Sequence, residues 1–381
     1  MARRVLVLGS TGSIGEQALE VIAGSDELEV AGLAAARSWE RACEQAAASG
    51  VEAIALLDGE AAAGAARQLE GCRVLSGEAG IRDLVVASKP DLVLNAIVGI
   101  AGLGPTIVAL TEGIDVALAN KESLVVGGEL VTALAEATGA RIIPVDSEHS
   151  ALHQLLGAER PGTVDRLVLT ASGGPFRGRT DLAGITAEEA LAHPTWEMGG
   201  RITIDSATLI NKGFEVIEAH HLFGVDYERI EVVVHPQSIV HALVDLNDGA
   251  SLAHLGHPDM RVPISYALHL GDRADVPVET LDLAAVGALT FERPDLETFP
   301  CLRLAREAGR AGGTAPCVLN AADEVAVAAF LAGAIPFTAI PELVERALDE
   351  IPAEVPGHFD DFYEADRRAR ELVEAAVGSA A

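Results

Sequence analysis

Short apolar runs alternate with amphipathic stretches in the amino-terminal part of the chain. The runs are rich in β-branched residues and lie at positions 5–8, 28–33, 53–57, 91–97, 115–118 and 141–145. Runs of this length between segments of helical periodicity predict buried strands joined by helices. Because such βαβ units form a parallel sheet with right-handed connections, the pattern predicts an α/β fold for residues 1–147.

The pattern changes after residue 147. Strand-like runs continue at 166–170 and 230–234, but glycine-rich loops and a helix near residues 209–222 separate them, which predicts an α+β domain over 148–270. Residues 271–296 are punctuated by proline, acidic and without periodicity, and predict a connecting segment. Alanine- and glutamate-rich stretches such as 321–330 and 343–348 predict a small helical domain at 297–381.

Composition narrows the class of protein. The chain has 381 residues, 49% of them hydrophobic, which is enough to bury a large core in several domains. No apolar stretch approaches the ~20 residues of a membrane span, so we expect no membrane association and a cytoplasmic location. A formal net charge of −30 argues against a nucleic-acid partner. The widely separated Cys43, Cys72, Cys301 and Cys317 argue against a disulfide framework or a zinc site.

A glycine-rich loop follows the first predicted strand. It reads Gly-Ser-Thr-Gly-Ser-Ile-Gly at positions 9–15 and precedes an amphipathic stretch. Glycines let the backbone turn tightly and approach a pyrophosphate, whose charge then lies at a helix N-terminus. The flanking strand and helix favour a dinucleotide site over an ordinary glycine-rich turn.

The end of the second predicted strand bears on which dinucleotide binds. An NAD site places Asp or Glu there to bind the ribose 2′-hydroxyl. This chain instead continues with Ala36, Arg37 and Ser38. A guanidinium and a hydroxyl suit a 2′-phosphate better, so the sequence favours NADPH; the alternative is that Arg37 is an ordinary solvated residue.

Three carboxylates are candidate metal ligands. Asp146 and Glu148 follow the run 141–145 two positions apart, so both are expected to leave a strand end in the same direction, at the sheet edge where ligands bind. Glu215 lies four positions after Asn211 and three after Lys212, which predicts one helical face. Carboxylate ligands favour Mg²⁺ or Mn²⁺. The alternative is helix capping by Asp146 and a surface position for Glu215.

Lysine is scarce in this chain, which contains only Lys89, Lys121 and Lys212. An ammonium is a compact point charge that arginine does not replace, so lysine at 121 and 212 suggests a chemical requirement, with chance as the alternative. Polar segments at 171–174, 205–208 and 211–212 offer hydroxyl, amide and ammonium donors for a phosphate, although each alone is typical of a turn or a helix cap.

The segment 193–200 combines His193, Trp196, Gly199 and Gly200 in a predicted loop. Glycines that act as hinges and a large aromatic residue that excludes water are typical of a closing lid. The alternative is a surface loop whose tryptophan packs on its own domain.

Taken together and in this order, the segments resemble the 1-deoxy-D-xylulose 5-phosphate reductoisomerase family. The resemblance covers essentially the whole chain. It rests on the loop at 9–15 and on Leu-Ala-Asn-Lys-Glu-Ser-Leu at 118–124, Pro-Val-Asp-Ser-Glu-His at 144–149, Ser-Gly-Gly-Pro-Phe at 172–176, Asp-Ser-Ala-Thr at 205–208, Asn-Lys-Gly at 211–213, His-Pro-Gln-Ser at 235–238 and Leu-Asn-Ala-Ala at 319–322.

The resemblance implies a role for each matching position. It implies an NADPH-binding Rossmann-like domain at 1–147, a catalytic domain with a flexible lid at 148–270 and a metal ion, Mg²⁺ or Mn²⁺ with Co²⁺ as an alternative, on Asp146, Glu148 and Glu215. The implied catalytic residues are Lys121, Glu148, His193 and Lys212. The implied substrate contacts are Lys121, Ser147, Glu148, Ser172, His193, Trp196, Ser206, Asn211, Lys212 and Glu215. The implied NADPH contacts are Thr11, Gly12, Ser13, Ile14, Ala36, Arg37, Ser38, Asn120, Glu122 and Gly199, of which Ala36 and Ser38 depart from the family's usual glycine and asparagine.

The implied reaction converts 1-deoxy-D-xylulose 5-phosphate to 2-C-methyl-D-erythritol 4-phosphate in the non-mevalonate isoprenoid precursor pathway. Rearrangement of the carbon skeleton gives an aldehyde, which NADPH reduces while the phosphate anchors the substrate. The resemblance also implies a homodimer acting on a small phosphorylated sugar. Two other hypotheses are a semialdehyde- or homoserine-type dehydrogenase, which would need no divalent metal, and a nucleotide-sensing regulator, which would bind cofactor without turnover.

Overall fold

A computed structural model describes residues 2–196 and 199–380. The chain divides into two compact units. The first contains the chain up to Ser123 with Val131–Ser150 and Asp259–Val278, and the second contains Leu124–Leu130, Ala151–Pro258 and the chain from Glu279 onward. The boundaries at 147, 270 and 296 remain a prediction.

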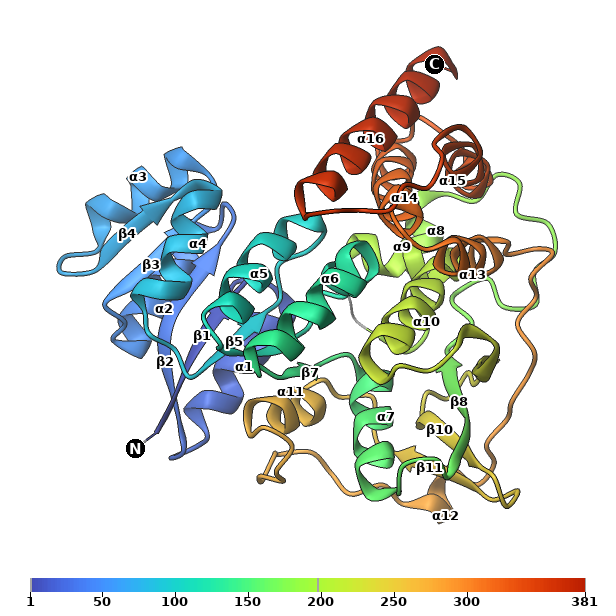
Figure 1. Ribbon diagram of the computed structural model, residues 1–381, viewed down its shortest axis with the longest axis horizontal. Coiled ribbons are helices and arrows are strands. Elements are labelled where there is room, and N and C mark those ends of the chain that lie inside the picture. The colour runs from blue at the N-terminus through green and yellow to red at the C-terminus, as the bar shows by residue number, and fades with distance from the viewer. Residues whose placement is uncertain (1, 197–198, 381) are drawn as a thin grey trace. The chain divides into compact units, whose positions relative to one another are not determined.

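The first unit is built on a seven-stranded parallel sheet of order β4-β3-β2-β1-β5-β6-β7 (Figure 1). Its strands are β1 (Arg3–Leu8), β2 (Leu28–Ala35), β3 (Ala53–Leu56), β4 (Arg73–Ser76), β5 (Leu92–Asn95), β6 (Asp115–Leu118) and β7 (Ile142–Pro144). All six predicted strands are present. The additional strand, β4, lies at the sheet edge and has no fully buried residue, which explains why no apolar run marks it.

Helices of the first unit lie between or beside these strands, and α1 (Ser13–Ala23), α2 (Trp39–Ser49), α3 (Gly59–Gln68) and α11 (Arg261–Leu268) supply apolar residues to one core. The unit also contains α4 (Gly77–Ala87), α5 (Leu103–Thr111) and a 3₁₀ turn at Ile100–Gly102, whereas α6 (Glu122–Thr138) and α7 (Ser147–Ala158) are divided between the two units. Val5 and Val7 of β1, Leu33 of β2 and Leu94 of β5 have no exposed surface in this core. The chain builds outward from β1 to β4 and then outward on the other side from β5, so the sheet has a topological switch point between β1 and β5.

The second unit contains a four-stranded sheet of order β11-β10-β8-β9, in which only β8 and β9 run parallel. Its strands are β8 (Val164–Ala171), β9 (Ile230–Val234), β10 (Val240–Leu246) and β11 (Ser251–Leu255). Its helices are α8 (Ala187–Leu191), α9 (Gly200–Thr208), α10 (Ile210–Phe223), α12 (Leu283–Val286), α13 (Cys301–Ala311), α14 (Ala315–Leu331), α15 (Ala339–Glu350) and α16 (Asp360–Ala380), with a 3₁₀ turn at Tyr227–Arg229.

The predicted α/β class is confirmed, with a parallel-sheet domain, a mixed sheet and a helical carboxyl-terminal region. The helix predicted near 209–222 is α10, and Leu209, with φ +64°, breaks the chain direction between α9 and α10. Among the described residues, no helix has the length and apolar character needed to cross a membrane.

Candidate active site

The glycine-rich loop lies between β1 and α1, at the switch point of the sheet. Gly9 has φ +81°, and a Cβ placed on it would lie 2.5 Å from the carbonyl oxygen of Ala96. A Cβ on Gly15 would lie 2.3 Å from the carbonyl oxygen of Gly9. Both positions therefore require glycine. The exposed Gly12 and Ser13 leave the N-terminus of α1 open to an anionic group, as a dinucleotide pyrophosphate requires.

The end of β2 presents Ala36, Arg37 and Ser38 to solvent. The Arg37 side chain is 86% exposed, and its Nε lies 3.7 Å from Oδ2 of Asp58. Ser38 precedes α2 without capping it through its side chain, so its hydroxyl is not used by that helix. The strand end thus offers a guanidinium, a hydroxyl and a helix N-terminus, which together suit a 2′-phosphate.

Asn120 and Glu122 follow β6 and are buried. The amide of Asn120 donates to the carbonyl oxygens of Ile97 (2.5 Å) and Gly99 (3.0 Å), and Glu122 Oε1 accepts from the Gly99 backbone N–H (3.0 Å). These bonds fix the loop that follows β5. A role of Asn120 and Glu122 in cofactor binding stays a prediction.

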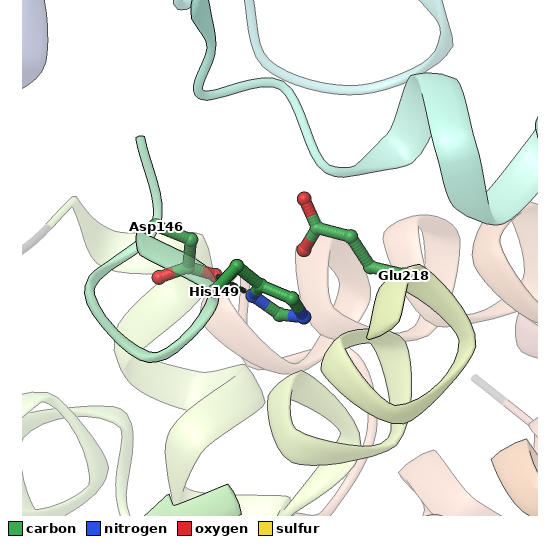
Figure 2. A group of neighbouring side chains, drawn as sticks. All are labelled: Asp146, His149 and Glu218. Carbon is green, nitrogen blue, oxygen red and sulfur yellow. Dashed lines mark ion pairs between the residues drawn. The ribbon is translucent and has the colours of Figure 1, made fainter. Parts of the chain in front are cut away.

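A partly buried ion pair forms between Lys121 and Asp146. Lys121 Nζ donates to Asp146 Oδ2 at 2.6 Å, and Nδ1 of His149 lies 3.7 Å from the same oxygen (Figure 2). Burial alone would raise the pKa of Asp146, but Lys121 and then His149 hold it well below its usual range. Asp146 is therefore an anion at neutral pH, as a metal ligand must be.

The predicted route by which Glu148 joins Asp146 is wrong. The strand β7 ends at Pro144 and α7 begins at Ser147, so Glu148 leaves the first turn of a helix and not a strand end. The Ser147 hydroxyl donates to Glu148 Oε2. A carboxylate oxygen of Asp146 nevertheless lies within 4.8 Å of one from Glu148, so the two groups converge.

In the second unit, one face of α10 presents Asn211, Lys212 and Glu215, which confirms the predicted helical spacing. Asn211 Nδ2 donates to Glu215 Oε1 at 2.7 Å, and Lys212 Nζ donates to Glu215 Oε2. Lys212 and Glu215 are 4% and 1% exposed. The surface alternative for Glu215 is therefore wrong. Each unit presents a carboxylate paired with a lysine, half-buried at Asp146 and buried at Glu215.

Ser172, in one of the predicted phosphate-binding segments, contacts His193. Ser172 Oγ lies 3.0 Å from Nε2 of His193. The backbone N–H groups of Thr195 (3.2 Å) and Trp196 (2.9 Å) donate to His193 Nδ1. Burial lowers the pKa of His193, so the ring is neutral and carries its proton on Nε2, which donates to Ser172.

Ser206 and its helix pack directly on the loop that follows Ser172. A Cβ on Gly174, which has φ +67°, would lie 2.8 Å from the carbonyl oxygen of Ser206. Only glycine allows this approach, and it brings two of the predicted phosphate segments together.

The predicted lid is described only in part. Glu197 and Met198 lie outside the described residues, Trp196 is half-buried, and Gly199 precedes the first turn of α9 as its N-cap. Movement of this segment as a lid stays a prediction.

Sequence reasoning missed two buried titratable residues near the candidate ligands, His149 and Glu218 (Figure 2). His149 lies in the first turn of α7, three positions after Asp146, and Glu218 lies three positions after Glu215 on α10. Helical spacing from the neighbouring carboxylates is the signal that would have found both.

These features define the class of the protein as an NADP-dependent oxidoreductase: a parallel sheet with a glycine loop at its switch point, a basic strand end and carboxylates paired with lysines. Family models match almost the entire chain. "1-deoxy-D-xylulose 5-phosphate reductoisomerase" matches residues 5–128, its C-terminal domain matches 142–223, and "DXP reductoisomerase C-terminal domain" matches 255–372. The chain belongs to the 1-deoxy-D-xylulose 5-phosphate reductoisomerase family.

Individual relatives agree over their full length. The chain is 52% identical to the 1-deoxy-D-xylulose 5-phosphate reductoisomerase of Symbiobacterium thermophilum, over 97% of this chain and 98% of the relative. It is 52% identical to that of Moorella thermoacetica, over 99% of both chains. Because these two matches cover nearly the full length of the chain, they exclude the hypothesis of a dehydrogenase that shares only the amino-terminal domain.

Solved structures agree as well. The Zymomonas mobilis enzyme in complex with NADPH has a TM-score of 0.91 at 39% identity and covers 99% of both chains. A DOX-P reductoisomerase in complex with NADPH, fosmidomycin and magnesium has a TM-score of 0.93 at 37% identity and covers 99% of this chain and 98% of that chain.

Proposed function

We propose that this chain catalyses the reaction of its family, the NADPH- and divalent-metal-dependent rearrangement and reduction of 1-deoxy-D-xylulose 5-phosphate to 2-C-methyl-D-erythritol 4-phosphate. The observation that carries the proposal is the pairing of the half-buried Asp146 with Lys121 and of the buried Glu215 with Lys212. Carboxylates held beside ammonium groups in sites with little solvent suit a reaction that needs a cation and an anionic substrate.

The metal is assigned to Asp146, Glu148 and Glu215. Hard carboxylate oxygens fit Mg²⁺ or Mn²⁺, with Co²⁺ as an alternative, and the low pKa of Asp146 keeps one of the donors ionised. When bound, such an ion supplies Lewis-acid polarisation of the substrate's carbonyl and hydroxyl oxygens. Ser147 orients Glu148 through its hydroxyl, and Asn211 orients Glu215 through its amide.

The substrate is assigned to hydrogen-bond donors of both units. Ser172, Ser206, Asn211 and Lys212 offer hydroxyl, amide and ammonium hydrogen bonds to the phosphate. The neutral His193 is held by two backbone N–H groups, so its ring is oriented before the substrate arrives. Lys121 would donate to a substrate oxygen beside Asp146, and Trp196 would cover the site if its segment closes.

The cofactor is assigned to the loop after β1 and to the ends of β2 and β6. Thr11, Gly12, Ser13 and Ile14 would hold the pyrophosphate at the N-terminus of α1. The remaining contacts assigned to NADPH are Ala36, Arg37, Ser38, Asn120, Glu122 and Gly199. When bound, NADPH supplies the hydride that reduces the rearranged aldehyde.

Replacing Arg37 tests the cofactor assignment. We expect Arg37→Ala to weaken NADPH binding about tenfold, the effect of one charge-assisted hydrogen bond, and to leave NADH binding unchanged because NADH has no 2′-phosphate. Titration of both dinucleotides, followed by fluorescence, measures the effect. Arg67→Ala is the matched control. Arg67 is exposed in the last turn of α3, whereas Asp58, the ion-pair partner of Arg37, caps the first turn of that helix. An equal loss for both dinucleotides would overturn the role of Arg37.

The protein is further assigned as a homodimer in the cytoplasm, on the resemblance to its family and on a chain that presents no membrane-spanning helix among its described residues. Sedimentation of the purified protein tests the dimer. A single species of the 39.5 kDa monomer across micromolar concentrations would contradict it.

The whole reaction is tested by NADPH oxidation with 1-deoxy-D-xylulose 5-phosphate, measured with added Mg²⁺ or Mn²⁺ and again with a chelator. We expect turnover that the chelator abolishes and that excess metal restores, because the carboxylates act only through a cation. Turnover that survives chelation would point to an ordinary dehydrogenase. Binding of NADPH without turnover would point to a nucleotide-sensing regulator.

A further inference from the structure

A network of charged side chains joins α9 to the carboxyl-terminal helices. At its centre, Arg201 of α9 donates from Nη1 to Glu324 Oε1 (2.9 Å) and from Nη2 to Asn320 Oδ1 (3.0 Å), both on α14. The same guanidinium faces two aspartates. Its Nε lies 3.5 Å from Asp205 Oδ2, and its Nη2 lies 3.7 Å from Asp323 Oδ2. One cation thus serves three carboxyl groups, none of which has a role in the proposed reaction.

The second arginine of the network, Arg370, does not neutralise the remaining negative charge. Arg370 of α16 donates to Glu324 Oε2 (2.5 Å) and to Asp366 Oδ2 (2.6 Å). Among the described residues, four carboxyl groups of this network therefore face two guanidinium groups, so that negative charge is in excess if all are ionised. Excess charge of this kind is strongly unfavourable in a buried site unless a proton reduces it.

Asp323 is the group best placed to keep a proton. It has no exposed surface, and among the described residues no N–H or hydroxyl group donates to either carboxyl oxygen, whereas the carboxyl group of Asp205 lies within hydrogen-bonding reach. Burial and then the neighbouring Asp205 raise the pKa of Asp323 well above its usual range, while Arg201 opposes them. Cys301 of α13 also faces the two aspartates. Its own thiol pKa is raised by burial and by both carboxyl groups, so it stays neutral.

We propose that Asp205 and Asp323 share one proton, and that Asp323 is through this pair a positioning residue that holds α9 for substrate binding. This inference rests on the proposed function, in which Ser206 contacts the substrate phosphate. Ser206 is next to Asp205 in sequence, and its carbonyl packs on Gly174, so a shift of α9 moves Ser206 relative to the Ser172 loop. Loss of the proton adds repulsion between α9 and α14, whose carboxyl groups there are Asp205, Asp323 and Glu324. Arg201 and Arg370 oppose this repulsion.

Asp323→Asn tests the inference, because asparagine keeps the shape of a neutral aspartic acid and cannot ionise. We expect the KM of the parent for 1-deoxy-D-xylulose 5-phosphate to rise at alkaline pH, by up to about tenfold per pH unit above the pKa of the pair. In Asp323→Asn that rise disappears, while kcat at saturating substrate and the Kd for NADPH stay close to those of the parent. Asp349→Asn, which removes an exposed carboxylate from α15, keeps the parent profile. An alkaline rise in KM that survives in Asp323→Asn overturns the positioning role.

Thermal unfolding as a function of pH tests the shared proton without substrate. A folded-state pKa above the unfolded value means that the folded protein binds more protons, so the contribution of Asp323 to stability falls as pH rises from about 4 through the folded pKa. The Tm of Asp323→Asn minus the Tm of the parent should therefore increase as pH rises, and this difference should become constant above the folded pKa. A Tm difference independent of pH overturns proton sharing. Because this measurement needs no turnover, its outcome is distinct from failure of the proposed reaction.

Discussion

Glu215→Gln is expected to lower kcat by about 10²-fold or more and to weaken binding of Mg²⁺ and Mn²⁺, with the fold retained. Glutamine keeps the shape of the side chain and an oxygen that accepts from Asn211, but it removes the negative charge. Glu215 is 1% exposed, so solvent cannot compensate for the lost interaction between this carboxylate and the metal ion. Metal titration by calorimetry and turnover at saturating metal measure the two effects separately.

The matched control is Glu374→Gln, which removes an exposed carboxylate from α16 and should leave both quantities unchanged. The melting temperature of each variant establishes whether the fold is retained. If Glu215→Gln turned over at the parent rate with the parent's metal dependence, the assignment of three carboxylates to the metal would be withdrawn.

The sheet of the first unit was predictable because each buried parallel strand is a continuous apolar run. The strand β4 was not, since Arg73 and Ser76 are exposed at the sheet edge and leave no run to detect. The strands β10 and β11 were missed for a similar reason. Half of β10 is not fully buried or is polar, and β11 has no fully buried residue.

The candidate site was predictable where its residues are close in sequence. The spacing of Asn211, Lys212 and Glu215 on one helical face follows from helix geometry and is confirmed. The path of Glu148 was not predictable, because the apolar run continues to Val145 although β7 ends at Pro144 and α7 begins at Ser147. The Arg201 network was not predictable at all, since Arg201 and Asn320 are 119 positions apart and no local pattern relates them.

This difference has a physical origin. Short-range periodicity reports which face of an element is buried, and that is sufficient to place Lys212 beside Glu215. Whether a buried charge then meets a second charge depends on tertiary packing. Gly213 shows the point: a Cβ there would lie 2.3 Å from Cβ of Ala305, so close packing of α10 on α13 depends on a residue with no side chain, which carries no hydrophobic signal.

Lys212→Arg is expected to lower kcat/KM by about 10²-fold although the charge is preserved. Lys212 is 4% exposed, and its ammonium donates to Glu215 Oε2 inside a tightly packed helix pair. A guanidinium is larger, planar and fixed in its donor geometry, so it cannot make this contact and also present a proton to a phosphate without moving its neighbours. We expect the loss mainly in KM for the phosphorylated substrate, with the Kd for NADPH unchanged.

The same substitution at Lys89 provides the control, because Lys89 is exposed and lies outside the candidate site. Steady-state kinetics of Lys89→Arg should match those of the parent, whereas those of Lys212→Arg should not. The same substitution would then lower activity at the buried Lys212, which is paired with a carboxylate, and leave activity unchanged at the exposed Lys89. Parent kinetics in Lys212→Arg would mean that lysine occurs there by chance, and the phosphate would have to be bound chiefly by Ser172, Ser206 and Asn211.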